Sequence, residues 1–275
     1  MNSFGSVIKE IRKKRKLTQK MLSEDICSQS VLSRIENNEE LPNVVVMQQI
    51  CQRLGVTMDQ IMHFRSEEVQ MLMQTFEKIA DYFRHKEYEK ILLFIEAIKL
   101  EDRIYLDSDW QRYFYYLGSC EFYLYNNYEK AIINLRKGLS YTYQTNKTNL
   151  SDFEIQIISC IGITYGLMGK REEAEKYLKL SIHYFHDLPN ERINAELTKI
   201  FFNYAYFLIQ EKRLQEALIY IDQGISWARK KNSYYYLEEL FDLKSELYSL
   251  MNDYANAKIY SQMAGHVGQI ACLKL

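Results

Sequence analysis

A four-residue motif recurs five times along the C-terminal two thirds of this 275-residue chain, at intervals of 40, 43, 43 and 40 residues. Each copy begins an amphipathic segment and follows another one, and four of the copies end in a small Ala that lets two antiparallel helices approach closely. A repeated helix pair cannot bury its apolar face alone, so the period predicts that neighbouring pairs stack into a superhelix. The copies are Tyr88–Ile91, Tyr128–Ala131, Arg171–Ala174, Leu214–Ala217 and Tyr254–Ala257.

The segment IGITYGLMGKREEA, residues 161–174, resembles the tetratricopeptide repeat (TPR) in its spacing of Gly, Tyr and Ala. The resemblance implies about five TPR-like helix pairs forming a right-handed superhelix over residues 66–275. The period is longer than the usual TPR length of about 34 residues, which requires longer turns or helices. A non-repeating helical bundle is the alternative. The expected first helices of the later pairs cover residues 110–125, 153–168, 191–209 and 235–250.

The composition agrees with an all-α protein, because the chain holds only 2 Pro and 10 Gly, with 47% hydrophobic and 26% charged residues. It has no apolar run long enough for a membrane span and no apolar core for a signal peptide, so we expect a cytoplasmic protein without a membrane partner. The five cysteines are scattered without a CxxC pair. They are expected to be small core residues rather than disulfides or zinc ligands.

The N-terminal segment Thr18–Glu36 reads as two short helices joined by a tight turn. Met21, Leu22 and Ile26 are expected to form the apolar stripe of the first helix, which Thr18 caps. Val31, Leu32 and Ile35 are expected to form the inner face of the second. A helical hairpin with a solvated polar face would share this pattern. The surroundings favour a helix-turn-helix, since further amphipathic segments at residues 4–15, 44–54 and 57–64 complete a compact five-helix domain over residues 1–65.

LTQKMLSEDI followed by SRIENNEELP resembles the lambda-repressor-like (XRE) helix-turn-helix family. The resemblance implies that Gln19 contacts a phosphate, that Glu36 pairs with an Arg of the first helix, here Arg12, and that the helix from about Gln29 to Glu36 enters the major groove of DNA. Cys27 stands where the family usually has Gly, in a turn one residue shorter. The residues expected to contact DNA are Gln19, Lys20, Ser28, Gln29, Ser30, Ser33 and Arg34.

Charge is unevenly divided, with 10 Lys and Arg against 7 Asp and Glu in residues 1–65, and 25 against 29 in the remainder. A mildly basic head and an acidic body fit a DNA-binding domain attached to a region that does not touch DNA. The excess of positive charge is small, so strong binding favours two heads acting together on a palindromic operator.

Stacked helix pairs create one concave surface, lined by the first helix of each repeat. Asn203, in the aromatic segment FFNYAYFL, is costly to bury unless its amide is bonded, and it could clamp the backbone of an extended peptide. Lys199, one helical turn away, could take a carboxylate. A bond from Asn203 to a neighbouring helix, with Lys199 merely solvated, is the alternative. The full set of expected peptide contacts is Asn203, Lys199, Gln156, Ser159, Tyr116, Glu239 and Glu246.

Together, the two halves of the chain resemble the RRNPP group of peptide-responsive quorum-sensing regulators, of the PlcR and Rgg type. The resemblance implies a homodimeric transcription regulator whose repeats bind a short signalling peptide, dimerise and set the spacing of the two DNA-binding heads. The second peptide-binding Asn of PlcR-type repeats falls near Ser159 here.

Three other functions share part of this pattern. One is an XRE-family repressor whose repeats serve only dimerisation or bind a protein partner. A Rap-like phosphatase or adaptor is disfavoured because that class lacks a DNA-binding head. An enzyme is disfavoured because the sequence shows no nucleophile–base pair, glycine-rich phosphate loop or metal-ligand spacing, so no catalytic residue, metal or cofactor is expected.

Overall fold

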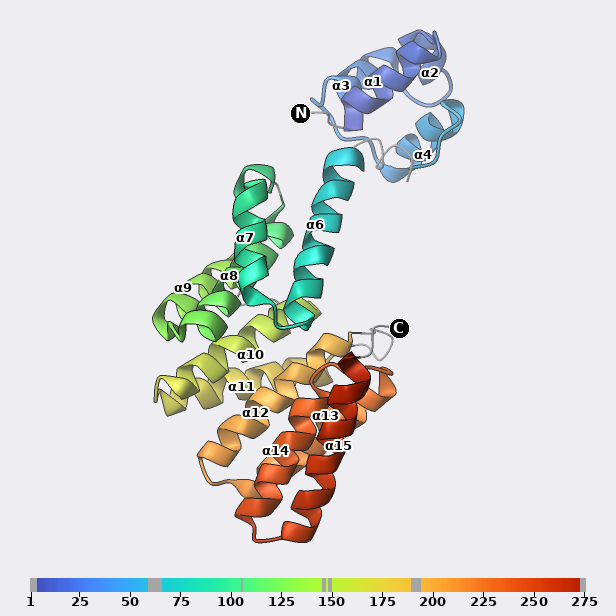
Figure 1. The fold of residues 1–275 in the computed structure, drawn as a ribbon. Helices are drawn as coiled ribbons and strands as arrows, with labels where there is room; N and C mark the ends of the chain where they lie inside the picture. The colour runs from blue at the N-terminus through green and yellow to red at the C-terminus, as the bar shows by residue number, and fades with distance from the viewer. Residues whose placement is uncertain are drawn as a thin grey trace. The chain divides into compact units, whose positions relative to one another are not determined.

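The computed structural model describes residues 4–58, 66–104, 106–144, 147, 150–188 and 194–272. Contacts between residues divide the chain into two compact units, residues 1–78 and 79–275. The described residues form helices and turns without a β-strand, which confirms the all-α prediction (Figure 1). The predicted domain boundary at residues 65 and 66 adjoins the segment 59–65, which lies outside the described residues.

The first unit begins with four short helices whose ends follow from their capping residues. Thr18, Ser28 and Asn43 each stand at an N-cap, where a side-chain oxygen accepts a hydrogen bond from the backbone N–H three residues later. The expected fifth helix at residues 57–64 lies almost entirely outside the described residues. The four helices are α1 (Phe4–Lys14), α2 (Gln19–Ser23), α3 (Gln29–Glu36) and α4 (Val44–Arg53).

The core of this unit is apolar and contributed by all four helices. Leu22, Leu32 and Ile35 are fully buried, as the sequence predicts, while Ile26 and Val31 pack half-buried against them. The prediction for Met21 was wrong, because its side chain is 51% exposed. The helix α2 has only five residues, and it turns Leu22 rather than Met21 toward the core.

The second unit is a stack of helix hairpins that follow one another along the chain (Figure 1). The helix α6 (Ser66–Arg84) extends from the first unit into the second and ends beside α7 (Tyr88–Ile98). Short 3-10 helices at Leu100–Arg103 and Ala195–Leu197 precede α8 and α12. The remaining helices are α8 (Asp107–Tyr125), α9 (Tyr128–Ser140), α10 (Asp152–Leu167), α11 (Arg171–His186), α12 (Thr198–Gln210), α13 (Leu214–Lys230), α14 (Leu237–Leu250) and α15 (Tyr254–Cys272).

Every one of the five recurring motifs begins the second helix of a hairpin, as the sequence predicts. Two residues before each motif, the backbone has a positive φ, which turns the chain between the two helices. Asn, Gly and Lys occupy these left-handed positions, so only some of the turns carry a residue that favours the conformation. The five positions are Lys86, Asn126, Gly169, Lys212 and Asn252.

The paired helices pack closely at small residues. Ala131, Ala174 and Ala217 are fully buried at the ends of their motifs. Gly162 allows a close approach, because a Cβ built there would lie 2.7 Å from Leu178 Cγ of the partner helix. Around these contacts the aromatic side chains fill the interior. Six of them are at most 7% exposed, and Tyr206 is half-buried; the six are Tyr113, Phe114, Tyr115, Tyr116, Tyr204 and Phe207.

Cys51, Cys120 and Cys160 are buried and unlinked, and Cys27 is half-buried against the core of the first unit. Cys272 ends α15, and its side chain lies outside the described residues. None of the described helices is long and apolar enough to cross a membrane. The described part of the chain also contains no group of three His, Cys, Asp or Glu side chains arranged to hold a metal ion.

Candidate nucleic-acid interface and candidate ligand site

The helix α3 presents a polar outer face above an apolar inner one. Gln29, Ser30 and Arg34 are exposed and Ser33 is half-buried, which agrees with the outward face predicted from the sequence. Ser28 uses its hydroxyl oxygen to cap α3 at the Val31 N–H and lies 2.9 Å from the Ser30 hydroxyl. The helix is therefore stabilised at its N-terminus by one of the residues predicted to contact DNA.

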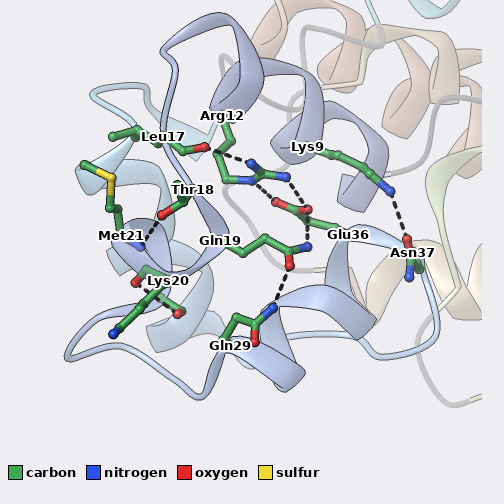
Figure 2. Close-up of polar contacts among 11 residues, drawn as sticks. Lys9, Arg12, Leu17, Thr18, Gln19, Lys20, Met21, Gln29, Glu36 and Asn37 are labelled. Carbon is green, nitrogen blue, oxygen red and sulfur yellow. Dashed lines mark hydrogen bonds and ion pairs between the residues drawn. The ribbon is translucent and has the colours of Figure 1, made fainter.

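A chain of charged and amide groups fixes α3 against α1 and α2 (Figure 2). Arg12 and Glu36 form the predicted ion pair, with Nε 2.5 Å from one carboxylate oxygen and Nη2 2.9 Å from the other. Burial alone would raise the pKa of Glu36, but hydrogen bonds from Arg12 and Gln19 outweigh burial and lower its pKa below the ordinary value. Arg12 also donates to the Leu17 carbonyl at 2.8 Å, so this buried pair has partners on both sides.

Gln19 links the buried pair to the surface of α3. Its Nε2 donates to Glu36 at 2.9 Å, and its Oε1 accepts a hydrogen bond of 2.9 Å from Gln29 Nε2 (Figure 2). Both ends of the Gln19 amide thus have partners within the protein, and the predicted phosphate contact remains a prediction. The Arg12–Glu36 pair thus orients the Gln29 side chain, because Gln19 bonds to both Glu36 and Gln29.

Arg34 and Lys20 complete the predicted set and lie at the surface. Arg34 forms an exposed ion pair with Glu40, at 2.7 Å, so its guanidinium must exchange that carboxylate for any other acceptor. Lys20 is exposed, and Lys9 of α1 donates to the Asn37 side chain at 3.0 Å (Figure 2). Lys13 and Lys14, at the end of α1, and Lys16, in the turn after it, are exposed as well.

In the second unit, Asn203 and Ser159 meet in the interior. Asn203 Nδ2 donates to Ser159 Oγ at 3.1 Å, and both residues are at most 3% exposed. This bond joins α12 to α10, the alternative that the sequence left open for Asn203. Gln156, one turn before Ser159 on α10, is 2% exposed, and its Nε2 has no hydrogen-bond partner among the described residues.

Lys199 lies in a cage of aromatic rings. Its ammonium is 5.0 Å from the ring centre of Phe83, 5.3 Å from Tyr123, 5.8 Å from Tyr115 and 5.9 Å from Tyr236. The residue is 2% exposed. Cation–π attraction partly offsets the loss of hydration of this charge. The alternative that Lys199 is merely solvated was therefore wrong, because aromatic side chains enclose it.

The other expected peptide contacts occupy three different environments. Tyr116 is 5% exposed and packs edge-on against Phe83. Glu239 is half-buried and pairs with Lys86 at 2.7 Å, whereas Glu246 is exposed. The structure thus brings Asn203, Ser159 and Lys199 to one interior region, and it does not bring Glu246 into contact with them.

A small pocket of about 10 Å³ lies beside Lys199, with room for about one water molecule. Tyr123 lines this pocket, and its hydroxyl forms a hydrogen bond of 3.0 Å with the hydroxyl of Tyr236, which lies 113 residues later in the chain. Sequence patterns do not single out Phe83, Tyr123 or Tyr236, because their roles depend on how distant repeats meet. The residues that line the pocket are Ser119, Phe122, Tyr123, Leu135, Cys160, Ile163, Thr164 and Lys199.

Comparisons with protein families match two parts of the chain. Residues 8–61 match the helix-turn-helix family, and residues 198–231 match the tetratricopeptide repeat. The first range covers α1 to α4, and the second covers the hairpin of α12 and α13, which holds Lys199 and Asn203. A search of curated protein sequences finds no relative.

Solved structures share the fold along the whole chain. Bacillus thuringiensis PlcR, in a complex with the peptide PapR7 and DNA, is 23% identical, with 100% of each chain covered and a TM-score of 0.64. PlcR in its apo form is 21% identical, with 94% of this chain and 92% of that chain covered and a TM-score of 0.61. ComR from S. thermophilus, in a complex with DNA and its signalling peptide, is 17% identical, with 98% and 94% covered and a TM-score of 0.60. The chain therefore has an N-terminal helix-turn-helix followed by TPR-like repeats, as its sequence predicts.

Proposed function

We propose that this chain, which has the fold of PlcR and ComR, is a DNA-binding transcription regulator of the RRNPP type, controlled by a short signalling peptide bound among its repeats. In this proposal residues 1–65 form the DNA-binding domain, and residues 66–275 bind the peptide and hold two copies of the chain together. The observation that carries the proposal is the union in one chain of a helix-turn-helix unit and repeats whose polar interior groups gather beside a pocket.

The DNA-binding half of the proposal rests on α3. Gln29, Ser30, Ser33 and Arg34 supply the short polar and bidentate side chains that read base edges in the major groove. Lys20, Ser28 and the basic residues of α1 supply contacts to phosphates, which fix the position of the helix without reading sequence. Two heads in a homodimer would read the two halves of a palindromic operator.

The peptide-binding half rests on α10 and α12. Asn203 and Gln156 offer amide groups to a peptide backbone, and Lys199 offers a positive charge in an apolar setting. The peptide acts through a difference in its affinity for two arrangements of the dimer, because a ligand that binds both equally shifts neither. Binding would exchange the Asn203–Ser159 hydrogen bond for bonds to the ligand.

Selection from random DNA duplexes by the full-length chain tests the DNA-binding half. We expect enrichment of an inverted repeat, and we expect the double variant Gln29→Ala/Arg34→Ala to lose this enrichment while its helical content is unchanged. Glu129→Ala, which changes an exposed residue of the repeats, is the matched control and should select the same sequence. Enrichment of the same repeat by the double variant would mean that α3 is not the reading helix.

A second function is favoured by one observation on the same interior. The pocket holds only about 10 Å³, and the ion pair Lys86–Glu239 joins the turn after α6 to α14. A closed interior of this kind fits repeats that serve only dimerisation or bind a protein partner on their outer surface. Under this alternative, operator binding would be the same with and without any peptide.

The proposal assigns the chain to the cytoplasm and gives it no enzymatic activity. The finding that no described helix could span a membrane agrees with this location. The chemical groups of the interior are hydrogen-bond donors and aromatic rings, which suit recognition of a ligand rather than covalent catalysis.

A further inference from the structure

Three buried groups in the interior of the repeats can donate hydrogen bonds and have no acceptor among the described residues. Lys199 is 2% exposed, and no described residue gives its ammonium a carboxylate or a hydrogen bond. The Gln156 Nε2 amide and the Tyr115 hydroxyl are buried without a partner among the described residues. Each of these groups can donate a hydrogen bond, and only Lys199 carries a charge.

The three donors belong to one region. Lys199 Nζ lies 5.8 Å from the ring centre of Tyr115 and lines the pocket together with Cys160. Gln156 precedes Cys160 by four residues on α10, so the two side chains lie on the same face of that helix. Tyr115, Gln156 and Lys199 thus converge from α8, α10 and α12.

Tyr115 and Tyr236 do not neutralise Lys199. Burial raises the pKa of both Tyr115 and Tyr236 well above the ordinary value, so these phenols remain neutral and bring no negative charge. A second lysine of the same unit shows the usual arrangement, because the 6% exposed Lys244 pairs with Asp222 at 2.5 Å. A buried ammonium without such a partner is costly to fold.

We propose that this donor cluster is a carboxylate site, and that the ligand of the repeats inserts a carboxylate beside Lys199, Gln156 and Tyr115. This inference rests on the proposed peptide-binding function and adds the chemical group that the interior recognises. A carboxylate supplies the missing negative charge and several acceptor positions, and the rings of Phe83, Tyr123 and Tyr236 suit an adjoining apolar residue of the ligand. Because the pocket is about 10 Å³, side chains around Lys199 must move to admit the group.

Affinity selection with the full-length chain and defined peptide pools tests the site. The first pool contains random octapeptides without Asp or Glu and with a free C-terminal carboxylate. The second pool has the same sequences as C-terminal amides. The third pool is also amidated, and each of its peptides carries a single Asp or Glu, placed at every position in turn across the pool. We expect ligands from the first pool or from the third, at least tenfold enriched over the second. Enrichment in the first pool identifies the C-terminal carboxylate, and enrichment in the third identifies an acidic side chain.

Variants then assign the effect to Lys199. Binding of the selected peptides should fall at least tenfold in Lys199→Met and should be unchanged in Lys244→Met, which removes a buried lysine that already has a carboxylate partner. Equal recovery from the amide pool without acidic residues would overturn the carboxylate site while leaving peptide binding intact. Recovery from none of the pools would overturn peptide binding itself, and the carboxylate site with it. The comparison between pools uses the wild-type chain, so it decides the question even if Lys199→Met does not fold.

Discussion

Arg12 and Lys199 are both buried cations, and their surroundings differ. Arg12 in the helix-turn-helix unit has a carboxylate and a carbonyl within 2.5 to 2.8 Å. Lys199 in the repeats has four aromatic rings and no anion among the described residues. A buried charge with all its partners in the protein holds the fold together, whereas a buried charge without an anion leaves an interaction for a ligand to complete.

Removing one partner of the Arg12–Glu36 pair should have the largest effect. Arg12→Met leaves Glu36 buried without its cation, which we expect to destabilise the N-terminal unit by about 3–5 kcal/mol. Hydrogen exchange of the α1 to α4 amides in the full chain measures this change. The double variant Arg12→Met/Glu36→Leu should recover most of the loss. If the single variant exchanges like the wild type, the pair does not stabilise the unit.

Replacing the two exposed reading residues should have the next largest effect, on DNA binding alone. Gln29→Ala and Arg34→Ala should each weaken operator binding by about 1–3 kcal/mol, because each removes a side chain suited to a base edge. Fluorescence anisotropy with the selected operator measures the change. Gln19→Ala should lower affinity as well, since it removes the group that orients Gln29. An unchanged affinity for Gln19→Ala would show that Gln29 does not need this support.

Breaking the Asn203–Ser159 bond tests the polar interior of the repeats. Asn203→Ala removes the donor to Ser159 and should destabilise the repeats by about 1–3 kcal/mol if no other group takes its place. The double variant Asn203→Ala/Ser159→Ala should be less damaged than the sum of the single variants. Hydrogen exchange of α10 and α12 reports stability, and peptide titration reports binding. A variant of normal stability that loses peptide affinity would assign Asn203 to the ligand.

Acidification below the ordinary carboxylate pKa of 4.5 should progressively weaken the N-terminal unit. The pKa of Glu36 is below the ordinary value of 4.5 in the folded chain, so its contribution is complete above that value and is lost as the pH falls through the lowered pKa. Exchange of the α3 amides between pH 5 and pH 3 follows this loss. Glu154 in the repeats also has a lowered pKa, so hydrogen exchange must be followed at the α3 amides alone. Glu36→Gln should make the profile flatter, and an identical profile would exclude Glu36 as the source.

The regular parts of the fold could be predicted from the sequence, and the contacts between distant repeats could not. The recurring motif predicted where α7, α9, α11, α13 and α15 begin, because a helix start depends on nearby residues. Arg12–Glu36 was predicted from the resemblance of the helix-turn-helix segment. The exposure of Met21 was missed, since it follows from the short length of α2.

The candidate ligand site was predicted only in part. Asn203 and Lys199 stood out as polar residues in aromatic helices. Which side chains of the other helices face them could not be predicted from the sequence. The cage depends on Phe83, Tyr123 and Tyr236, which come from three different hairpins, and on the turn at Tyr236, which has a φ of 59°. Lys86 and Lys212 occupy two of the turn positions, and a left-handed conformation is not predicted for lysine.

The most direct test of the comparison between the two cations is the unfolding of the full-length chain with one cation replaced at a time. Hydrogen exchange under increasing urea reports the stability of each unit separately. The account predicts that Lys199→Met stabilises the repeats, by as much as about 1–4 kcal/mol, since an unpaired buried charge gives way to an apolar side chain of similar length. It also predicts that Arg12→Met destabilises the N-terminal unit. Destabilisation of the repeats by Lys199→Met as large as that of the N-terminal unit by Arg12→Met would contradict it, because Lys199 would then be a structural cation like Arg12.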